Sequence, residues 1–84
     1  MDIKDILDEH RATLIELCEP QILNLKESYP DLEKEYREQM INEFQDDCRG
    51  EIAGYISFYL GIDYLSIKEV LEDIDMFYYL DFSL

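Results

Sequence analysis

Apolar residues recur at every fourth position through one long stretch of this chain. The residues with this spacing are Leu32, Tyr36, Met40, Phe44 and Cys48, with Ile41 beside them. Four residues advance 400° around an α-helix, so each apolar residue turns about 40° from the last and the stripe slants around the axis. Continued to Leu60, the stripe would turn by about 280°, too far for one straight buried face. The spacing therefore predicts a helix from Pro30 to about Arg49, with a break near Gly50.

Four further segments carry helical signals. Asp2 to Cys18 has its apolar residues on one face, and Asp2 is placed to cap this helix. Pro20 ends that helix or opens the next, a short one that covers Gln21 to Ser28. Glu51 to Leu60 is apolar on nearly all sides, which is typical of a helix central to a core. A strand competes for this last segment because β-branched and aromatic residues are dense in it, but no second convincing strand exists to pair with it.

The fourth segment begins at Ser66 with a capping box, Ser66-Ile-Lys-Glu69, and continues through an apolar run to Tyr78. Together the segments predict an all-α fold, a small single-domain bundle of four to five helices in which residues 1–84 form one acidic helical domain. Chains of this size bury about 64% of their unfolded surface, so a modest core is feasible. We expect Cys18 and Cys48 to be buried thiols and His10 to be a half-buried packing residue.

The chain carries 21 acidic and 7 basic residues, a formal net charge of −14. This charge disfavours direct binding to nucleic acid or to an anionic membrane, because both attract positive charge. A compact body of this length is about 31 Å across. That gives roughly one net negative charge per 2 Å, comparable with one per ~1.7 Å in duplex DNA, so the charge density allows imitation of a nucleic acid.

Like charges also face each other along the predicted helices. Five acidic pairs fall four residues apart: Asp5/Glu9, Asp31/Glu35, Glu43/Asp47, Asp47/Glu51 and Glu69/Asp73. Only Glu33/Arg37 has the favourable order of acid then base at this spacing. Five such pairs cost roughly 1–2.5 kcal/mol, a sizeable share of the ~5 kcal/mol expected for so small a domain. This self-repulsion suggests that the charge has a use; a solvated surface that only keeps the protein soluble is the alternative.

Motifs for catalysis are not found in the sequence. There is no dinucleotide or phosphate loop, no H-E-x-x-H, no nucleophile elbow and no C-x-x-C. His10 and Cys18 are about 12 Å apart along a helix, too far for a catalytic pair. Acidic pairs such as Asp46-Asp47 are expected by chance among so many acids, and no EF-hand loop is present. We therefore expect a protein that is not an enzyme and that has no cofactor or metal site.

The partner-binding residues are expected on the outward acidic faces of the third and last helices. The acidic candidates are Glu43, Asp46, Asp47, Glu51, Glu69, Glu72, Asp73 and Asp75. Tyr79 is predicted to face outward beside them as an aromatic anchor, because exposed tyrosines are frequent at interfaces. Phe77, Tyr78 and Leu80 are expected to dock on the core.

These features predict a non-enzymatic inhibitor that presents acidic helix faces to the basic surface of a nucleic-acid-binding or nuclease complex. By analogy of class alone, nuclease immunity proteins and phage inhibitors that imitate nucleic acid are small and acidic in this way. The most specific version is a phage or mobile-element counter-defence protein, such as an anti-CRISPR or anti-restriction protein. The alternative is a structural or regulatory protein that self-associates, for example as a homodimer, through its aromatic C-terminal segment. No membrane-length apolar stretch or secretory leader is evident, so we expect a cytoplasmic protein.

Overall fold

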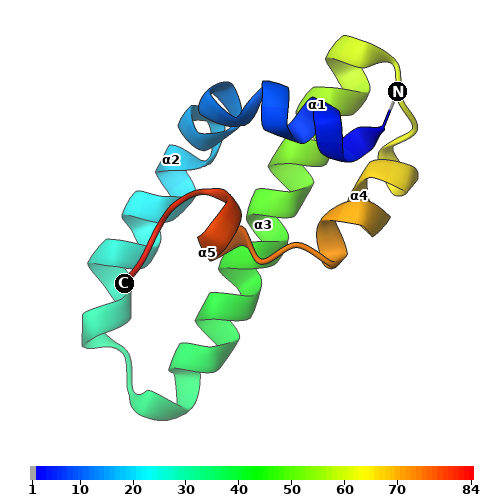
Figure 1. Cartoon of the computed structure of the whole chain (residues 1–84). Helices are drawn as coiled ribbons and strands as arrows, with labels where there is room; N and C mark the ends of the chain where they lie inside the picture. Colours follow the sequence, from blue (N-terminus) through cyan, green and yellow to red (C-terminus); the bar gives the residue numbers. More distant parts are fainter. Residues whose placement is uncertain (1) are drawn as a thin grey trace.

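The chain forms a bundle of helices joined by short turns (Figure 1) in a computed structural model that describes residues 2–84. The elements are α1 (Ile3–Glu9), α2 (Arg11–Ser28), the 3₁₀ turn η1 (Tyr29–Asp31), α3 (Lys34–Leu60), α4 (Tyr64–Glu72) and α5 (Met76–Tyr79). No strand occurs among the described residues. The predicted small all-α bundle is confirmed.

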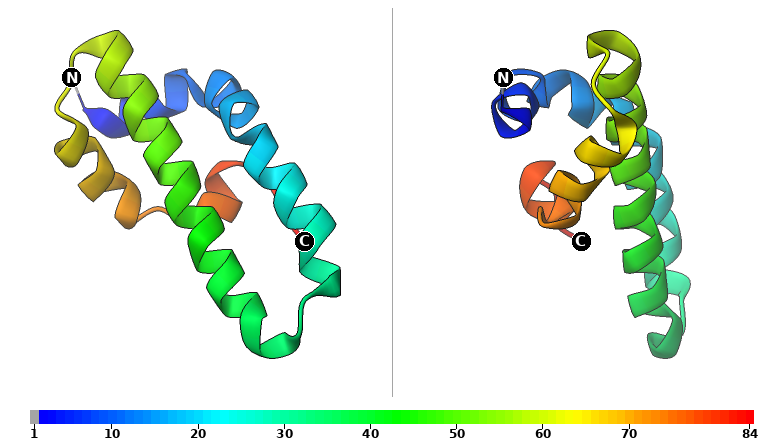
Figure 2. Two further views of the ribbon diagram at one scale, coloured as in Figure 1. Left: turned by 180° about the vertical axis from the view of Figure 1, so that it is seen from behind. Right: turned by 90° about the vertical axis from the view of Figure 1, so that its right-hand side faces the viewer.

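The helices lie in two layers (Figure 2). α2 and α3 form an antiparallel hairpin joined by η1, and α1, α4 and α5 lie against one side of it. The core fills the space between the layers, and its side chains are Ile6, Leu7, Leu14, Cys18, Leu25, Phe44, Cys48, Ile52, Ala53, Ile56, Ile67, Leu71, Met76, Tyr79 and Leu80. Cys18 and Cys48 are buried, as predicted. Within residues 2–84 no element covers the other side of the hairpin, which is its open face.

The first helical segment is divided differently from the prediction. α1 ends at Glu9, and the half-buried His10, with φ −99° and ψ 12°, separates it from α2. Pro20 lies inside α2 and neither ends nor opens a helix. The helix continues because Leu14 before the proline and Leu25 after it are both buried, and their burial outweighs the hydrogen bond that proline cannot donate.

α3 is a single helix of 27 residues that passes through Gly50, so the predicted break there is wrong. The middle of the slanting apolar stripe, from Phe44 to Ile56, is buried because different partners cover successive parts of it, whereas Tyr36 and Leu60 toward its two ends are exposed. The ring of Phe44 packs against those of Phe77 and Phe82 in the C-terminal segment, with centroids 5.3 and 5.7 Å away. Further along, Arg49 lies beside the end of α4, which packs along the same helix.

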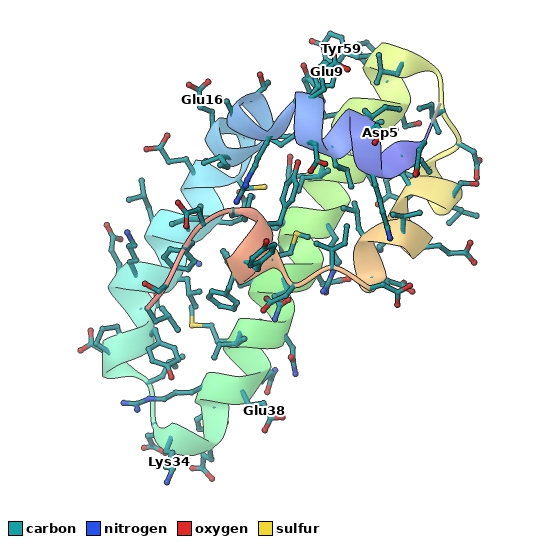
Figure 3. The ribbon with its side chains drawn as sticks, viewed as in Figure 1. Asp5, Glu9, Glu16, Lys34, Glu38 and Tyr59 are labelled. Carbon is teal, nitrogen blue, oxygen red and sulfur yellow. The ribbon has the colours of Figure 1, made fainter. Side chains whose placement is uncertain are left out.

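The last turn of α3 projects from the body of the molecule, and Figure 3 shows Tyr59 at this end. Phe58 is 81% exposed and Tyr59 is 66% exposed, although Ile56 just before them is buried. The expectation that Glu51 to Leu60 is buried on all sides is therefore wrong for its final turn. The helix ends at Gly61, whose φ of 67° is the left-handed conformation that glycine adopts most easily at a helix C-terminus.

α4 begins earlier than predicted and is shorter. Asp63 is its N-cap, with the carboxylate accepting a hydrogen bond from the Ser66 backbone N at 3.1 Å. The capping box expected to start at Ser66 is therefore wrong, because Asp63 already serves the first turn. The helix ends at Glu72, and α5 begins separately after its own cap, Asp75.

The unbroken α3 makes the molecule elongated. Its extents are 43 × 21 × 19 Å, and its radius of gyration is 13.2 Å, against about 12 Å for a compact chain of this length. Fourteen net charges over 43 Å give one per about 3 Å, roughly half the density of duplex DNA. The linear charge density predicted for a compact body is therefore too high. No helix of the described chain is long and apolar enough to cross a membrane.

Replacing Pro20 with alanine should stabilise the protein. A proline inside a helix costs about 3 kcal/mol through the missing hydrogen bond and the crowded carbonyl one turn earlier, whereas proline restricts the unfolded chain by only about 0.4–1 kcal/mol. We expect Pro20→Ala to raise the free energy of unfolding by about 2–2.6 kcal/mol, measured by urea denaturation. An unchanged urea midpoint would show that bending of α2 has already relieved the crowding.

Candidate protein-binding surface

The three arginines bind backbone carbonyl groups near the ends of helices. Arg49 Nε and Nη2 donate to Leu71 O and Ile74 O, both at 2.9 Å. Arg11 donates in the same way to two carbonyls at the end of α5, at 2.7 and 3.2 Å, and Arg37 donates to the carbonyl ahead of α3 at 3.1 Å. Carbonyls at helix C-termini lack partners within the helix, so a charged donor stabilises them.

Few basic side chains therefore remain to neutralise the acids. Within residues 2–84 one ion pair is formed, with Lys68 Nζ 4.0 Å from Asp46 Oδ1. The favourable pair expected between Glu33 and Arg37 is not made, because Arg37 is turned toward a carbonyl and the ring of Tyr29. Most carboxylates of the described chain thus have no cation within salt-bridge distance.

The expected repulsion between acids is present on two helices. Three like-charge pairs lie wholly within one helix: Asp5/Glu9 in α1, and Glu43/Asp47 and Asp47/Glu51 in α3. Of the other two, Asp31/Glu35 spans the start of α3, and Glu69/Asp73 ends one residue beyond α4. Three pairs cost roughly 0.6–1.5 kcal/mol, less than the sequence suggested.

Three of the predicted residues, Glu43, Asp47 and Glu51, form a row along the seam between α2 and α3, which we call the seam row. They follow one another at intervals of about one turn, and all three are exposed. Glu43 and Asp47 border a pocket between the two helices, and Glu51 borders a second one toward the end of α3. The row exists because α3 continues through Gly50; a break there would have separated Glu51 from the others.

The pocket beside the seam row contains an unsatisfied hydrogen-bond acceptor. Gln21 Oε1, from α2, is buried and has no hydrogen-bond partner within the described chain. Glu43 Oε1 accepts a hydrogen bond from Gln39 Nε2 at 3.1 Å, and the carboxylate of Asp47 borders the same pocket. A guanidinium or ammonium group supplied by another protein would donate to these oxygens.

The remaining predicted acids lie on the other flank of α3. Asp46 faces α4, where it pairs with Lys68. The exposed acids of α4 and the turn after it are Glu69, Glu72 and Asp73. Asp75 is the N-cap of α5, with its carboxylate accepting from the Phe77 backbone N at 3.0 Å, so it has a structural role. The predicted acids therefore form two separate sets, one on each flank of α3. They do not make up one continuous surface.

The prediction that Tyr79 faces outward is wrong. Its side chain is only 6% exposed, and its hydroxyl donates to Leu7 O at 2.6 Å. Tyr78, which was expected to dock on the core, is 81% exposed. The turn between α4 and α5 breaks the helical phase, so the residues of α5 do not continue the faces of α4. Tyr79 is therefore a core residue and not an interface anchor.

The two cysteines lie together in the core and are inaccessible. Cys18 Sγ is 3.9 Å from Cys48 O, in position to donate to it. The hydrogen bond with Cys18, together with burial, raises the pKa of the Cys48 thiol above its ordinary value. No cluster of three or more His, Cys, Asp or Glu side chains in residues 2–84 is arranged to hold a metal ion.

Comparison with known proteins assigns no family to this chain. No protein-family model, curated protein or solved structure matches it. Its function is therefore inferred from the uncompensated acids, the seam row and the pocket beside it.

Tyr79→Phe should lower stability, whereas Tyr78→Phe should not. The first change removes the buried hydrogen bond to Leu7 and should cost about 0.5–1.5 kcal/mol. For a domain of this size each kcal/mol lowers Tm by roughly 4–8 °C, which thermal denaturation resolves. The second change removes the same group from an exposed side chain. Equal melting temperatures for the two variants would contradict the structural role of the Tyr79 hydroxyl.

Tyr79 should also make stability fall at alkaline pH. Burial is the largest cause that raises the pKa of Tyr79, from 10.0 to about 12. The unfolded chain therefore ionises before the folded one, so this stability is complete below pH 10 and is lost as pH rises through about 12. The urea midpoint of the wild type should fall more steeply over this range than that of Tyr79→Phe. Parallel pH profiles would contradict the assignment.

Arg49→Gln should destabilise the protein far more than Lys34→Gln. The two changes alter net charge equally, but only Arg49 binds carbonyl groups; Lys34 makes no hydrogen bond or ion pair through its side chain within residues 2–84. Hydrogen bonds from a charged donor are worth about 1.5–3 kcal/mol each, so we expect a loss of at least that size in urea denaturation. Similar losses in both variants would show that net charge, and not the carbonyl contacts, controls stability.

Proposed function

We propose that this chain is a non-enzymatic inhibitor that binds another protein, presenting the seam row to a basic surface that otherwise holds nucleic acid. One observation carries the proposal: the arginines bind the chain's own carbonyl groups, so the carboxylates of the described chain are left almost without internal cations. A basic partner would supply the missing positive charge. Such complementarity speeds association and selects the partner.

The placement of the acids supports this reading over a uniformly solvated surface. Asp47 repels both Glu43 and Glu51 on the same helix, an arrangement that costs roughly 0.4–1 kcal/mol. Arg49 is close in sequence but turns to the opposite flank, where it binds the end of α4. The Gln21 Oε1 atom beside the row is an acceptor that no donor of the described chain uses. An arginine or lysine of the target that enters the pocket would donate to this oxygen and relieve the repulsion between the carboxylates.

The spacing of the row supports imitation of a nucleic-acid strand. Residues four apart on a helix are separated by about 6 Å along its axis. Two nucleotides of one DNA strand advance roughly 7 Å along the duplex axis, so the axial repeat of the carboxylates is close to that of alternate phosphates. The lower charge density of the whole molecule favours local imitation, over three carboxylates, rather than imitation of a duplex along its full length.

On this proposal the protein inhibits by occupation: it covers the basic groove and excludes the nucleic acid, with no chemical step, metal or cofactor. The target is a nucleic-acid-binding or nuclease complex. The most specific form is a phage or mobile-element protein acting in the cytoplasm against host defence, as an anti-CRISPR or anti-restriction protein does. The small size and the high negative charge support this form.

The test is affinity capture followed by competition with nucleic acid. The immobilised protein is exposed to lysate of the source cells or their host, and bound proteins are eluted with a short DNA or RNA duplex. We expect nucleic-acid-binding proteins that the duplex releases. The interaction should weaken steeply between about 50 and 500 mM NaCl, because salt screens attraction between opposite charges.

Two matched variants locate the surface, each removing three negative charges. The seam variant is Glu43→Gln, Asp47→Asn and Glu51→Gln. The flank variant is Glu69→Gln, Glu72→Gln and Asp73→Asn. We expect at least a tenfold loss of affinity for the purified target in the seam variant, corresponding to about 1.4 kcal/mol, and a smaller loss in the flank variant. Equal binding by the seam variant and the wild type, or a bound protein that duplex does not displace, would contradict the proposal.

A further inference from the structure

The end of the molecule formed by the last turn of α3 and the first turn of α4 is apolar and exposed. We define the aromatic tip as Phe58, Tyr59, Leu60, Tyr64 and Leu65. Phe58 is 81% exposed and Leu65 is 69% exposed, and Tyr59 stands at the end of α3 in Figure 3. The tip lies outside the core, and no other part of residues 2–84 covers its exposed apolar area.

The rings of the tip are held in place before any partner arrives. The Tyr59 ring packs on that of Tyr55, with centroids 4.6 Å apart, and meets the Phe58 ring edge-on at 5.1 Å. From α4, Tyr64 reaches back toward α3, where its hydroxyl would lie 3.7 Å from a Cβ atom added at Gly50. Rings fixed in this way lose little conformational entropy on binding, which favours their use in an interface.

The tip is also the part of the chain with the lowest density of charge. Residues 52–67 contain one charged residue, Asp63, in a protein with 28 charged residues of 84. Asp63 is occupied as the N-cap of α4. Glu51, the last member of the seam row, borders the pocket that Phe58 and Tyr59 also line, but the tip itself carries no row of carboxylates, so the complementarity argued for the seam row ends there. A second copy of this acidic chain would meet less electrostatic repulsion here than at its acidic helix faces.

The exposed area fits a weak contact between two copies. A buried aromatic side chain covers about 150–250 Å², so the three aromatic residues of the tip expose roughly 400 Å², to which the two leucines add. A standard interface covers about 800 Å² per partner, and weaker, transient ones fall below about 600 Å². The tip alone therefore supports a dimer that forms only at high concentration.

We propose that two copies of the chain associate tip to tip. The sequence predicts a different contact, self-association through the aromatic C-terminal segment. That segment exposes less apolar surface, because Tyr79 and Leu80 are buried. The rings of Phe77 and Phe82 pack around Phe44. The proposed contact does not depend on the inhibitor function. It is built from different residues, which lie at one end of α3.

Tip-to-tip association keeps the acidic rows of the two copies apart. Glu51, Asp47 and Glu43 lie about 10, 16 and 22 Å from Phe58 along α3, all farther than the Debye length of about 8 Å at physiological salt. The remaining repulsion between two bodies of charge −14 is screened as salt rises. Self-association should therefore strengthen with salt, whereas binding to a basic target weakens.

The test is sedimentation velocity on the full chain over a concentration series, at about 50 and 500 mM NaCl. We expect the dimer fraction to rise with concentration and with salt. The double variant Phe58→Gln/Leu65→Gln should weaken the dimer at least tenfold. Tyr78→Gln is the matched control, since Tyr78 has the same exposed fraction as Phe58 and lies on α5. Circular dichroism checks that each variant keeps its helices.

Three results would overturn the inference. The first is a wild-type protein that stays monomeric at about 1 mM and high salt, since contacts with a dissociation constant near that value are detectable there. The second is a dimer that the tip variant leaves intact. The third is a monomer that floats with phosphatidylcholine vesicles and loses this binding in Phe58→Gln/Leu65→Gln, which would assign the tip to lipid. A dimer that X-ray scattering shows to be about twice the 43 Å length of one copy would support the end-to-end contact.

Discussion

The guanidinium of Arg49 joins the two layers of this fold and, in doing so, shapes its surface. It donates to Leu71 O and Ile74 O, and so fixes the end of α4 and the turn into α5 against α3. Glu72 and Asp73 at this same end are unfavourable, because the C-terminus of a helix already carries partial negative charge. The guanidinium offsets that repulsion. Arg11 and Arg37 also bind backbone carbonyl groups. The arginines that join the helices are therefore not available to pair with the carboxylates. The uncompensated acidic surface follows from how the helices are joined.

The fold class could be predicted from the sequence because it depends on local periodicity, whereas the helix boundaries could not. Apolar spacing identifies Phe44, Cys48 and Ile52 as core residues, and the cap at Asp2 is local chemistry that the structure contains. The helix boundaries depend on which other elements pack against each face of a helix. Gly50 and Pro20 are weak or unfavourable helix residues, yet both lie inside helices, since the apolar residues on either side of them are buried together. The sequence of α3 alone does not indicate which elements will pack against successive parts of its apolar stripe.

The candidate site was predictable in composition but not in geometry. Exposure of the acids follows from their type, but the seam row requires the continuity of α3, and the positions of Tyr78 and Tyr79 require the turn before α5. The sequence does contain one indication of the pocket beside the seam row. Leu14, Cys18, Gln21 and Leu25 share the spacing of a buried helical face, so a polar side chain sits at an apolar position of α2. This spacing predicts a buried polar group on the face of α2 that meets α3. Only the structure shows that the Gln21 side chain borders the same pocket as Glu43 and Asp47.

The seam row and the aromatic tip are compatible in one assembly, because they lie along the same helix but at different distances from its end. A tip-to-tip dimer leaves both seam rows exposed and roughly doubles the length over which carboxylates are presented. A target with two basic surfaces, such as a symmetric nuclease or a filament on nucleic acid, would then be bound at two points, and the second contact would form at a high effective concentration. Salt acts in opposite directions on the two contacts: screening weakens each row's attraction for the target while it strengthens the junction of the two copies. The avidity of such a dimer would therefore change less steeply with ionic strength than the binding of one seam row alone.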